Sequence, residues 1–344
     1  MSAKIANSIF LRALQFIVFL YGSSVLGQVN QLLNFETPGF YLMPSEAGTH
    51  SNKWVAASYI NSKVILKDMP LRSYAVSGDY QLKRGLQSLY VGGGIGSMKI
   101  LGSPYQENEF YLTGAFHKII RNHTLHVGLQ PGLLTRNLDL GSLQFPDQYD
   151  RETGNYNPNI PTNETVALAD NAMGLNLNVG LAYGYRMNKA YSKIIVAGRN
   201  LTKPNLSFTT NPVIVTHQWI AQVKTDYYLT NVDLIRAYLM VRSTSIQTET
   251  YIGGQLIHKL VRQNFLMNEI SGGTYVALRN NDYPNNIVFQ MGFGIQNLKV
   301  GLAYSYNFVG NQASVNSFNT FEVVLSLMGL NTNLEYYKVP CEIY

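Results

Sequence analysis

The stretch 174–186, GLNLNVGLAYGYR, alternates strictly between large apolar side chains and small or polar ones. Successive side chains of a β-strand point to opposite faces, so the two kinds would occupy different faces of a strand. The apolar face comprises Leu175, Leu177, Val179, Leu181, Tyr183 and Tyr185, and the other face Asn176, Asn178, Gly180, Ala182, Gly184 and Arg186. A strand of this length whose apolar face ends in tyrosines is typical of a transmembrane β-barrel, where aromatic girdles border the lipid-facing band.

The same alternation recurs along the chain. In 234–243 the apolar row of Ile235, Ala237, Leu239 and Val241 opposes a row that contains Arg236 and Arg242. Similar rows occur in 218–227, 286–295 and 298–306. We predict an all-β protein, a transmembrane antiparallel barrel of about fourteen strands, at 52–60, 71–80, 89–99, 109–120, 123–136, 173–186, 191–200, 216–228, 233–243, 248–260, 266–278, 286–295, 298–307 and 319–328.

The connections between these strands alternate in length. Those at 121–122, 187–189, 229–232, 261–264 and 296–297 are tight, whereas those at 61–70, 100–108, 137–172, 201–215, 279–285 and 308–318 are longer. Only the connection near Thr244 and Ser245 departs from this alternation, because it is short where a longer one is expected. Outer-membrane barrels have short periplasmic turns and longer external loops, and a soluble sandwich predicts no such alternation.

Composition excludes several other classes. Of 344 residues 46% are hydrophobic and only 13% are charged, which is unlike a disordered chain. The net charge of +6 comes from scattered basic residues rather than the basic stripe of a nucleic-acid binder, so we expect no nucleic-acid partner. The single cysteine, Cys341, cannot form an intramolecular disulfide or a four-thiolate zinc site.

Four regions follow from these patterns. Residues 1–27 read as a secretory signal peptide, with Lys4 and Arg12 before or within an apolar run too short to span a membrane as a helix. Residues 28–51 form an N-terminal segment that either plugs the lumen, meets periplasmic partners or is a frayed end. The barrel occupies 52–328, with one long external loop at 137–172, and a C-terminal tail occupies 329–344. We therefore expect an outer-membrane location and the lipid bilayer as a partner.

No motif predicts a cofactor or a metal. The glycines of 92–96 lack the Lys-Ser/Thr and the helix of a phosphate-binding loop, and are better explained as strand glycines. His123 and His126 are three residues apart and would lie on opposite faces of one strand. Asp147 and Asp150 share the long loop with no histidine, so we expect no cofactor and no enzymatic activity.

Two groups of residues are candidates for function. The 137–172 loop is long enough to be either a partner-binding loop or a surface loop without a role. Within it Phe145, Asp147, Tyr149 and Asp150 are the candidate partner contacts. In the strands, alternation places charged residues on the lumen side, where they would set the selectivity of an open pore: Lys224, Asp226, Arg236 and Arg242.

Several stretches resemble the PorP/SprF family of type IX secretion outer-membrane proteins. The entry 40–50, FYLMPSEAGTH, followed by Trp54, partly matches an Asn-Pro-Ala-x-Ala-Gly type element of that family and departs from it at Ser45 and Glu46. The segment 141–150, with FPDQYD at its end, is similar to the family's long loop. The stretches 179–185 and 196–201 look like one of its hairpins.

The resemblance implies a barrel that works with other type IX secretion components and helps a secreted surface protein, such as a large adhesin, reach or stay on the cell surface. The C-terminal region of that partner would be the part that is recognised. The resemblance implies no catalytic residues. The alternative interpretation is a diffusion porin or small-solute channel, and a barrel enzyme is a third with less support.

Overall fold

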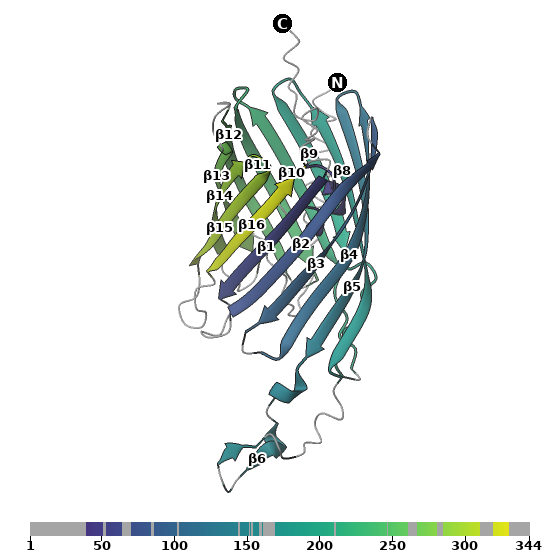
Figure 1. Ribbon diagram of the computed structural model, residues 1–344, viewed down its shortest axis with the longest axis vertical. Helices are drawn as coiled ribbons and strands as arrows, with labels where there is room; N and C mark the ends of the chain where they lie inside the picture. Colours follow the sequence, from purple (N-terminus) through teal and green to yellow (C-terminus); the bar gives the residue numbers. More distant parts are fainter. Residues whose placement is uncertain are drawn as a thin grey trace.

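The computed structural model describes residues 39–50, 53–63, 70–83, 86–101, 103–143, 145–150, 152, 154–157, 160, 169–209, 211–245, 247–260, 267–280, 285–309 and 319–329. Within these ranges fourteen antiparallel strands close into one barrel (Figure 1), because β1 pairs with β2 on one side and with β16 on the other. The predicted barrel and its strand number are confirmed. No helix in this part of the chain is both long and apolar enough to cross a bilayer.

Each predicted strand corresponds to one observed strand, with ends that differ by a few residues. The observed wall consists of β1 (Lys53–Lys63), β2 (Pro70–Lys83), β3 (Gln87–Ile100), β4 (Tyr105–Ile120), β5 (His123–Leu138), β8 (Asn171–Arg186), β9 (Ala190–Arg199), β10 (Gln218–Tyr228), β11 (Asp233–Thr244), β12 (Thr248–Lys259), β13 (Met267–Arg279), β14 (Asn285–Ile295), β15 (Leu298–Val309) and β16 (Thr320–Met328). The glycines of 92–96 lie in β3, as the sequence predicts.

The two faces of the wall have opposite character. Along β11 Ile235 and Leu239 are exposed on the outside, whereas Arg236, Met240 and Arg242 are buried on the inside. The same pattern in β8 exposes Leu181 and Tyr183 and buries Asn176 and Asn178. An apolar outer face with a polar, filled interior is the arrangement of an outer-membrane barrel.

The two ends of the barrel also differ. The short turns lie at one end, where Arg121 and Gln296 adopt positive φ angles of 54° and 52° in two-residue hairpin turns. The long connection between β5 and β8 projects from the other end, at the bottom of Figure 1. Because short turns face the periplasm, the long-loop end is external.

The long external loop contains structure that the sequence did not predict. Its described residues form two short 3-10 helices, η2 (Leu140–Ser142) and η3 (Pro146–Gln148), and a two-stranded ribbon of β6 (Tyr149–Asp150) and β7 (Asn155–Tyr156). Strands of two residues are too short to show a periodicity, which explains why sequence alternation did not reveal them.

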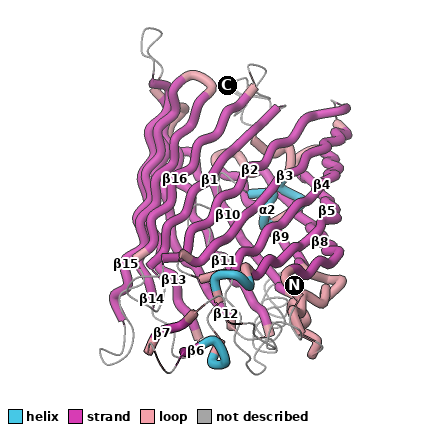
Figure 2. The backbone as a smooth tube through the Cα atoms, turned by 60° about the horizontal axis from the view of Figure 1, so that its bottom comes forward, coloured by secondary structure: helices cyan, strands magenta, loops and turns pink. Residues whose placement is uncertain are grey.

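A short N-terminal segment lies inside the barrel. It consists of helix α2 (Gly39–Leu42), helix η1 (Pro44–Glu46) and the residues up to His50, and we call residues 39–50 the luminal segment. Figure 2 shows α2 surrounded by the barrel wall. The predicted signal peptide (1–27), the beginning of the 28–51 segment and the tail beyond Gly329 lie outside the described residues.

Candidate functional site

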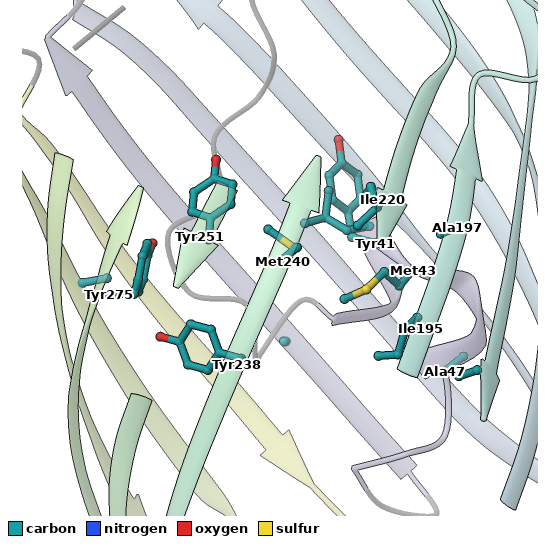
Figure 3. Packing of buried hydrophobic residues seen from close by; sticks show 14 of the residues in the cluster. Tyr41, Met43, Ala47, Ile195, Ala197, Ile220, Tyr238, Met240, Tyr251 and Tyr275 are labelled. Carbon is teal, nitrogen blue, oxygen red and sulfur yellow. The ribbon is translucent and has the colours of Figure 1, made fainter. Parts of the chain in front are cut away.

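The luminal segment is packed against the inner wall. Tyr41, Leu42, Met43 and Ala47 are each at most 4% exposed and belong to the main buried cluster. Figure 3 shows Tyr41, Met43 and Ala47 beside the inward side chains of β9 and β10, among them Ile195 and Ile220. Burial of these apolar side chains supplies the nonpolar part of the docking free energy, at about 25 cal/mol per Å² of apolar surface removed from water.

Two glycines of the wall allow this close approach. A Cβ atom added at Gly128 of β5 would overlap the carbonyl group of Pro44, and one added at Gly180 of β8 would lie 2.8 Å from the backbone nitrogen of Ser45. Helix η1 therefore lies directly on the backbone of these two adjacent strands, which any larger residue would prevent.

A buried ion pair ties the segment to β9, the strand next to β8. The ammonium of Lys193 in β9 donates to Oε1 of Glu46 at 2.8 Å, and both side chains are 7% exposed. Burial alone would raise the pKa of Glu46, but the positive charges of Lys193 and Lys224 outweigh it and lower that pKa to about 2. Glu46 is therefore ionised at neutral pH and holds the segment by charge as well as by packing.

A second polar cluster holds the start of the segment nearer the external end. The hydroxyl of Tyr41 donates to Oε2 of Glu109 in β4 at 2.8 Å, and the guanidinium of Arg199 in β9 bonds both carboxylate oxygens of Glu109. Asn176 in β8 donates to the same carboxylate, and Arg199 lies 4.7 Å from the centre of the Tyr41 ring. Burial, followed by the charge of Glu109, raises the pKa of Tyr41, so its hydroxyl remains a donor.

The far end of the segment is fixed near the short-turn end of the barrel. The backbone N–H of Gly48 donates to Oδ2 of Asp79 at 2.9 Å, and Gly48 has a φ of 80°, which favours glycine. His50 then stacks on Trp54 at a ring distance of 5.2 Å. The segment thus runs through the lumen from Glu109, near the loop end of β4, to Asp79, which pairs with Trp54 near the start of β1.

Two buried histidines lie on the inner wall next to the luminal segment. His117 in β4 and His126 in β5 are direct cross-strand partners, both 2% exposed, with ring centres 4.2 Å apart. His123, in contrast, lies on the outer face and bonds the hydroxyl of Tyr183 at 2.6 Å, so the predicted separation of His123 and His126 onto opposite faces is observed. Among the described residues no three ligand-type side chains are grouped for a metal ion.

Three of the four predicted luminal charges take part in a further set of ion pairs. Arg236 forms a bidentate ion pair with Asp226. Its Nε donates to Oδ1 at 2.6 Å and its Nη2 donates to Oδ2 at 2.8 Å, and the two residues are 7% and 3% exposed. Arg242, 1% exposed, bonds Glu249 and the hydroxyl of Tyr251, and Arg279 bonds the other oxygen of Glu249 at 2.8 Å. Lys224 pairs in register with Lys193 and Tyr238 and contributes to the positive potential at Glu46.

The predicted partner contacts lie on the external loop, apart from the lumen. Tyr149 and Asp147 are exposed, whereas Phe145 and Asp150 are half-buried. Tyr149 pairs with Tyr156 across the ribbon, with ring centres 5.4 Å apart, and Asp150 caps the turn by accepting from the backbone of Glu152. The ribbon presents both tyrosines at 46% exposure, which makes it a candidate contact surface.

The luminal segment was not identified from the sequence as the centre of the polar network. Alternation marks Lys193 and Arg199 as inward, and the tight turn at 121–122 fixes the pairing of His117 with His126, so these positions were available in principle. For Glu46 the sequence offers a different indication. It is one of the two positions at which the chain departs from the PorP/SprF entry element.

An outer-membrane β-barrel with a segment of its own chain in the lumen is the class that this geometry defines. The chain matches the type IX secretion system membrane protein PorP/SprF over residues 25–327, and it therefore belongs to that family. No curated protein matches the chain significantly.

Solved structures with the same fold are distant in sequence. The toluene transporter TodX of Pseudomonas putida is 9% identical with a TM-score of 0.53, over 89% of this chain and 98% of that chain. The toluene transporter TbuX of Ralstonia pickettii is 11% identical with a TM-score of 0.51, over 90% of this chain and 99% of that chain. At this identity the likeness concerns the barrel fold alone.

Proposed function

We propose that this protein is a non-enzymatic outer-membrane component of type IX secretion that helps export a partner or hold it at the cell surface. The partner would be a secreted surface protein such as a large adhesin, recognised through its C-terminal region and accompanied by other secretion components. Membership of the PorP/SprF family is the observation that carries the proposal.

Two structural features support a role in binding rather than in free diffusion. The luminal segment lies in the barrel on a buried ion pair, Glu46 with Lys193, and on the Tyr41–Glu109–Arg199 cluster. The external loop between β5 and β8 projects beyond the barrel and presents the β6–β7 ribbon away from the wall (Figure 1). A long loop on a rigid scaffold is a common position for a binding surface.

The experiment is affinity purification from gently solubilised outer membranes, followed by mass spectrometry of the proteins that remain bound. The wild-type chain is compared with a variant in which residues 143–161 are replaced by a short glycine-serine linker, and heat-modifiable migration verifies that the barrel is folded. We expect a large surface protein and secretion components with the wild type, and loss of the surface protein with the loop variant. Equal recovery with both proteins contradicts the role of the loop.

The second candidate is a small-solute channel. It is favoured by the fold, because the similar structures are described as toluene transporters, and by the charged residues that line the lumen. Single-channel recording in planar bilayers separates the candidates. A steady conductance in the wild type favours the channel, whereas a silent barrel favours the secretion role.

A further inference from the structure

The outer surface of the barrel carries a basic pair at the external end of β2 and β3. Arg72 and Lys99 are direct cross-strand partners, and both belong to the outward-facing rows, since their neighbours Leu71, Ser73 and Met98 are buried inside. Like charges directly opposite one another on adjacent strands are destabilising unless an anion lies between them. Neither residue takes part in a salt bridge among the described residues, and Nε of Arg72 is buried there with no hydrogen-bond partner.

The surroundings of the pair contain polar side chains and no described acid. The outward row continues from Arg72 to Asn61 of β1 and from Lys99 to Gln106 of β4. The acidic residues of the wall strands point inward, apart from Asp233, which lies at the short-turn end and bonds His258. The described outer wall therefore offers no carboxylate to neutralise Arg72 and Lys99.

The position of Arg72 and Lys99 along the barrel axis indicates which kind of anion they bind. One step toward the barrel centre on the same face, Tyr59 and Tyr74 pack with ring centres 5.1 Å apart, and the next step holds Ala57, Val76 and Ile95. Tyrosines mark the boundary of the lipid hydrocarbon, so Arg72 and Lys99 lie at the level of the headgroups. They lie at the long-loop end, which is the side of the outer leaflet (Figure 1).

We propose that Arg72 and Lys99 bind a phosphate group of the phosphorylated glycolipid of the outer leaflet, lipid A. An arginine guanidinium bonds phosphate oxygens with two parallel N–H groups, and a lysine ammonium adds a compact second charge. The acyl chains of the lipid then lie on the apolar rows of β1 to β4, on the side of the tyrosines that faces the membrane centre. This site is separate from the lumen and from the external loop, and it does not rest on the proposed secretion role.

The test measures lipid retention by native mass spectrometry of the whole protein in delipidating detergent. The probes are diphosphorylated lipid A, the same lipid with its phosphates removed, phosphatidylglycerol and inorganic phosphate. We expect the wild type to retain diphosphorylated lipid A and the double variant R72Q/K99Q to bind it about 100-fold more weakly, which is about 10-fold for each of the two lost charge-assisted contacts. The single variant R72K keeps the charge and loses only the bidentate geometry, so its affinity should fall between the two.

The matched control removes the same amount of charge at the other end of the barrel. Lys53 of β1 and Lys118 of β4 face outward near the short turns, and K53Q/K118Q should bind lipid A like the wild type. The proposal is overturned if R72Q/K99Q binds normally while folded, if K53Q/K118Q weakens binding equally, or if dephosphorylated lipid A or phosphatidylglycerol binds as tightly. Equally tight binding of inorganic phosphate would also overturn it, because the site would then take a free anion.

Discussion

Glu46 of the luminal segment accepts a hydrogen bond from the ammonium of Lys193 at 2.8 Å, although the two residues lie 147 positions apart in the chain. Lys193 belongs to the rigid wall, whereas Glu46 belongs to a segment with only two short helices of its own. Segments this short do not hold a helical conformation by themselves, so the segment depends on the wall for its structure. The pair is therefore the natural place to weaken the segment without altering the barrel.

Replacing Glu46 with glutamine should release the luminal segment. The variant removes the carboxylate that faces the buried ammonium of Lys193, which costs about 3 kcal/mol. The readout is the rate at which a maleimide labels a cysteine placed at Ala47, which is fully buried, in a chain with Cys341 replaced by serine. A loss of about 3 kcal/mol corresponds to labelling on the order of 100-fold faster.

The double variant E46Q/K193M provides the control for this prediction. It removes both charges, so the penalty of burying the ammonium without the Glu46 carboxylate disappears and labelling should return most of the way to the wild-type rate. If E46Q alone labels at the wild-type rate, the ion pair does not hold the segment.

Acid should release the same segment. The pKa of Glu46 is lowered to about 2 in the folded protein, so the ion pair stabilises docking fully above the unfolded value near 4.5 and loses this contribution as the pH falls from there through 2. The emission of Trp54, which stacks on His50, reports the change once Trp219 is replaced by phenylalanine. We expect a transition between about pH 4.5 and pH 2 that is absent from E46Q.

Gly128 should be intolerant of even one added methyl group. In the variant G128A the new Cβ would overlap the carbonyl of Pro44, and overpacking of this kind costs about 1–3 kcal/mol. Labelling at position 47 should therefore accelerate while the barrel keeps its heat-modifiable migration. Gly114 of β4 is the matched control, since a Cβ added there has no neighbour within 4 Å, and G114A should label as the wild type does.

The wall and the lumen differ in how far the sequence predicts them. Alternation with period two is enforced by lipid on one face, so Leu175 and Leu239 identify their strands and the inward arginines follow by parity. The luminal segment has no such constraint, because its four-residue helix α2 is too short to show a periodicity and its helix η1 packs on glycines 128 and 180 far along the chain. Its contacts, such as Tyr41 with Glu109, depend on side-chain geometry that only the closed barrel creates.

Glu249 should contribute strongly to the stability of the barrel. It is shared by Arg242 and Arg279, so the variant E249Q leaves two buried guanidiniums without their carboxylate, at a cost of about 3 kcal/mol. Urea unfolding in detergent micelles measures the change in the free energy of unfolding. The control variant T250V changes the neighbouring outward residue and should lower the free energy of unfolding far less. A similar loss in both variants would mean that the cluster of Glu249 with its two arginines makes no particular contribution to stability.

The tyrosine pair of the external ribbon provides the finest test of the partner-binding loop. Tyr149 and Tyr156 pack across β6 and β7, and a cross-strand aromatic pair contributes about 0.5–1.5 kcal/mol, which is a large share for a ribbon of two-residue strands. The variant Y149A/Y156A should reduce recovery of the surface partner in affinity purification, without changing the stability of the barrel or the labelling rate at position 47. The variant Y149F/Y156F keeps both rings and should retain the partner. If the phenylalanine variant loses the partner as fully as the alanine variant, the hydroxyl groups rather than the packed ribbon make the contact.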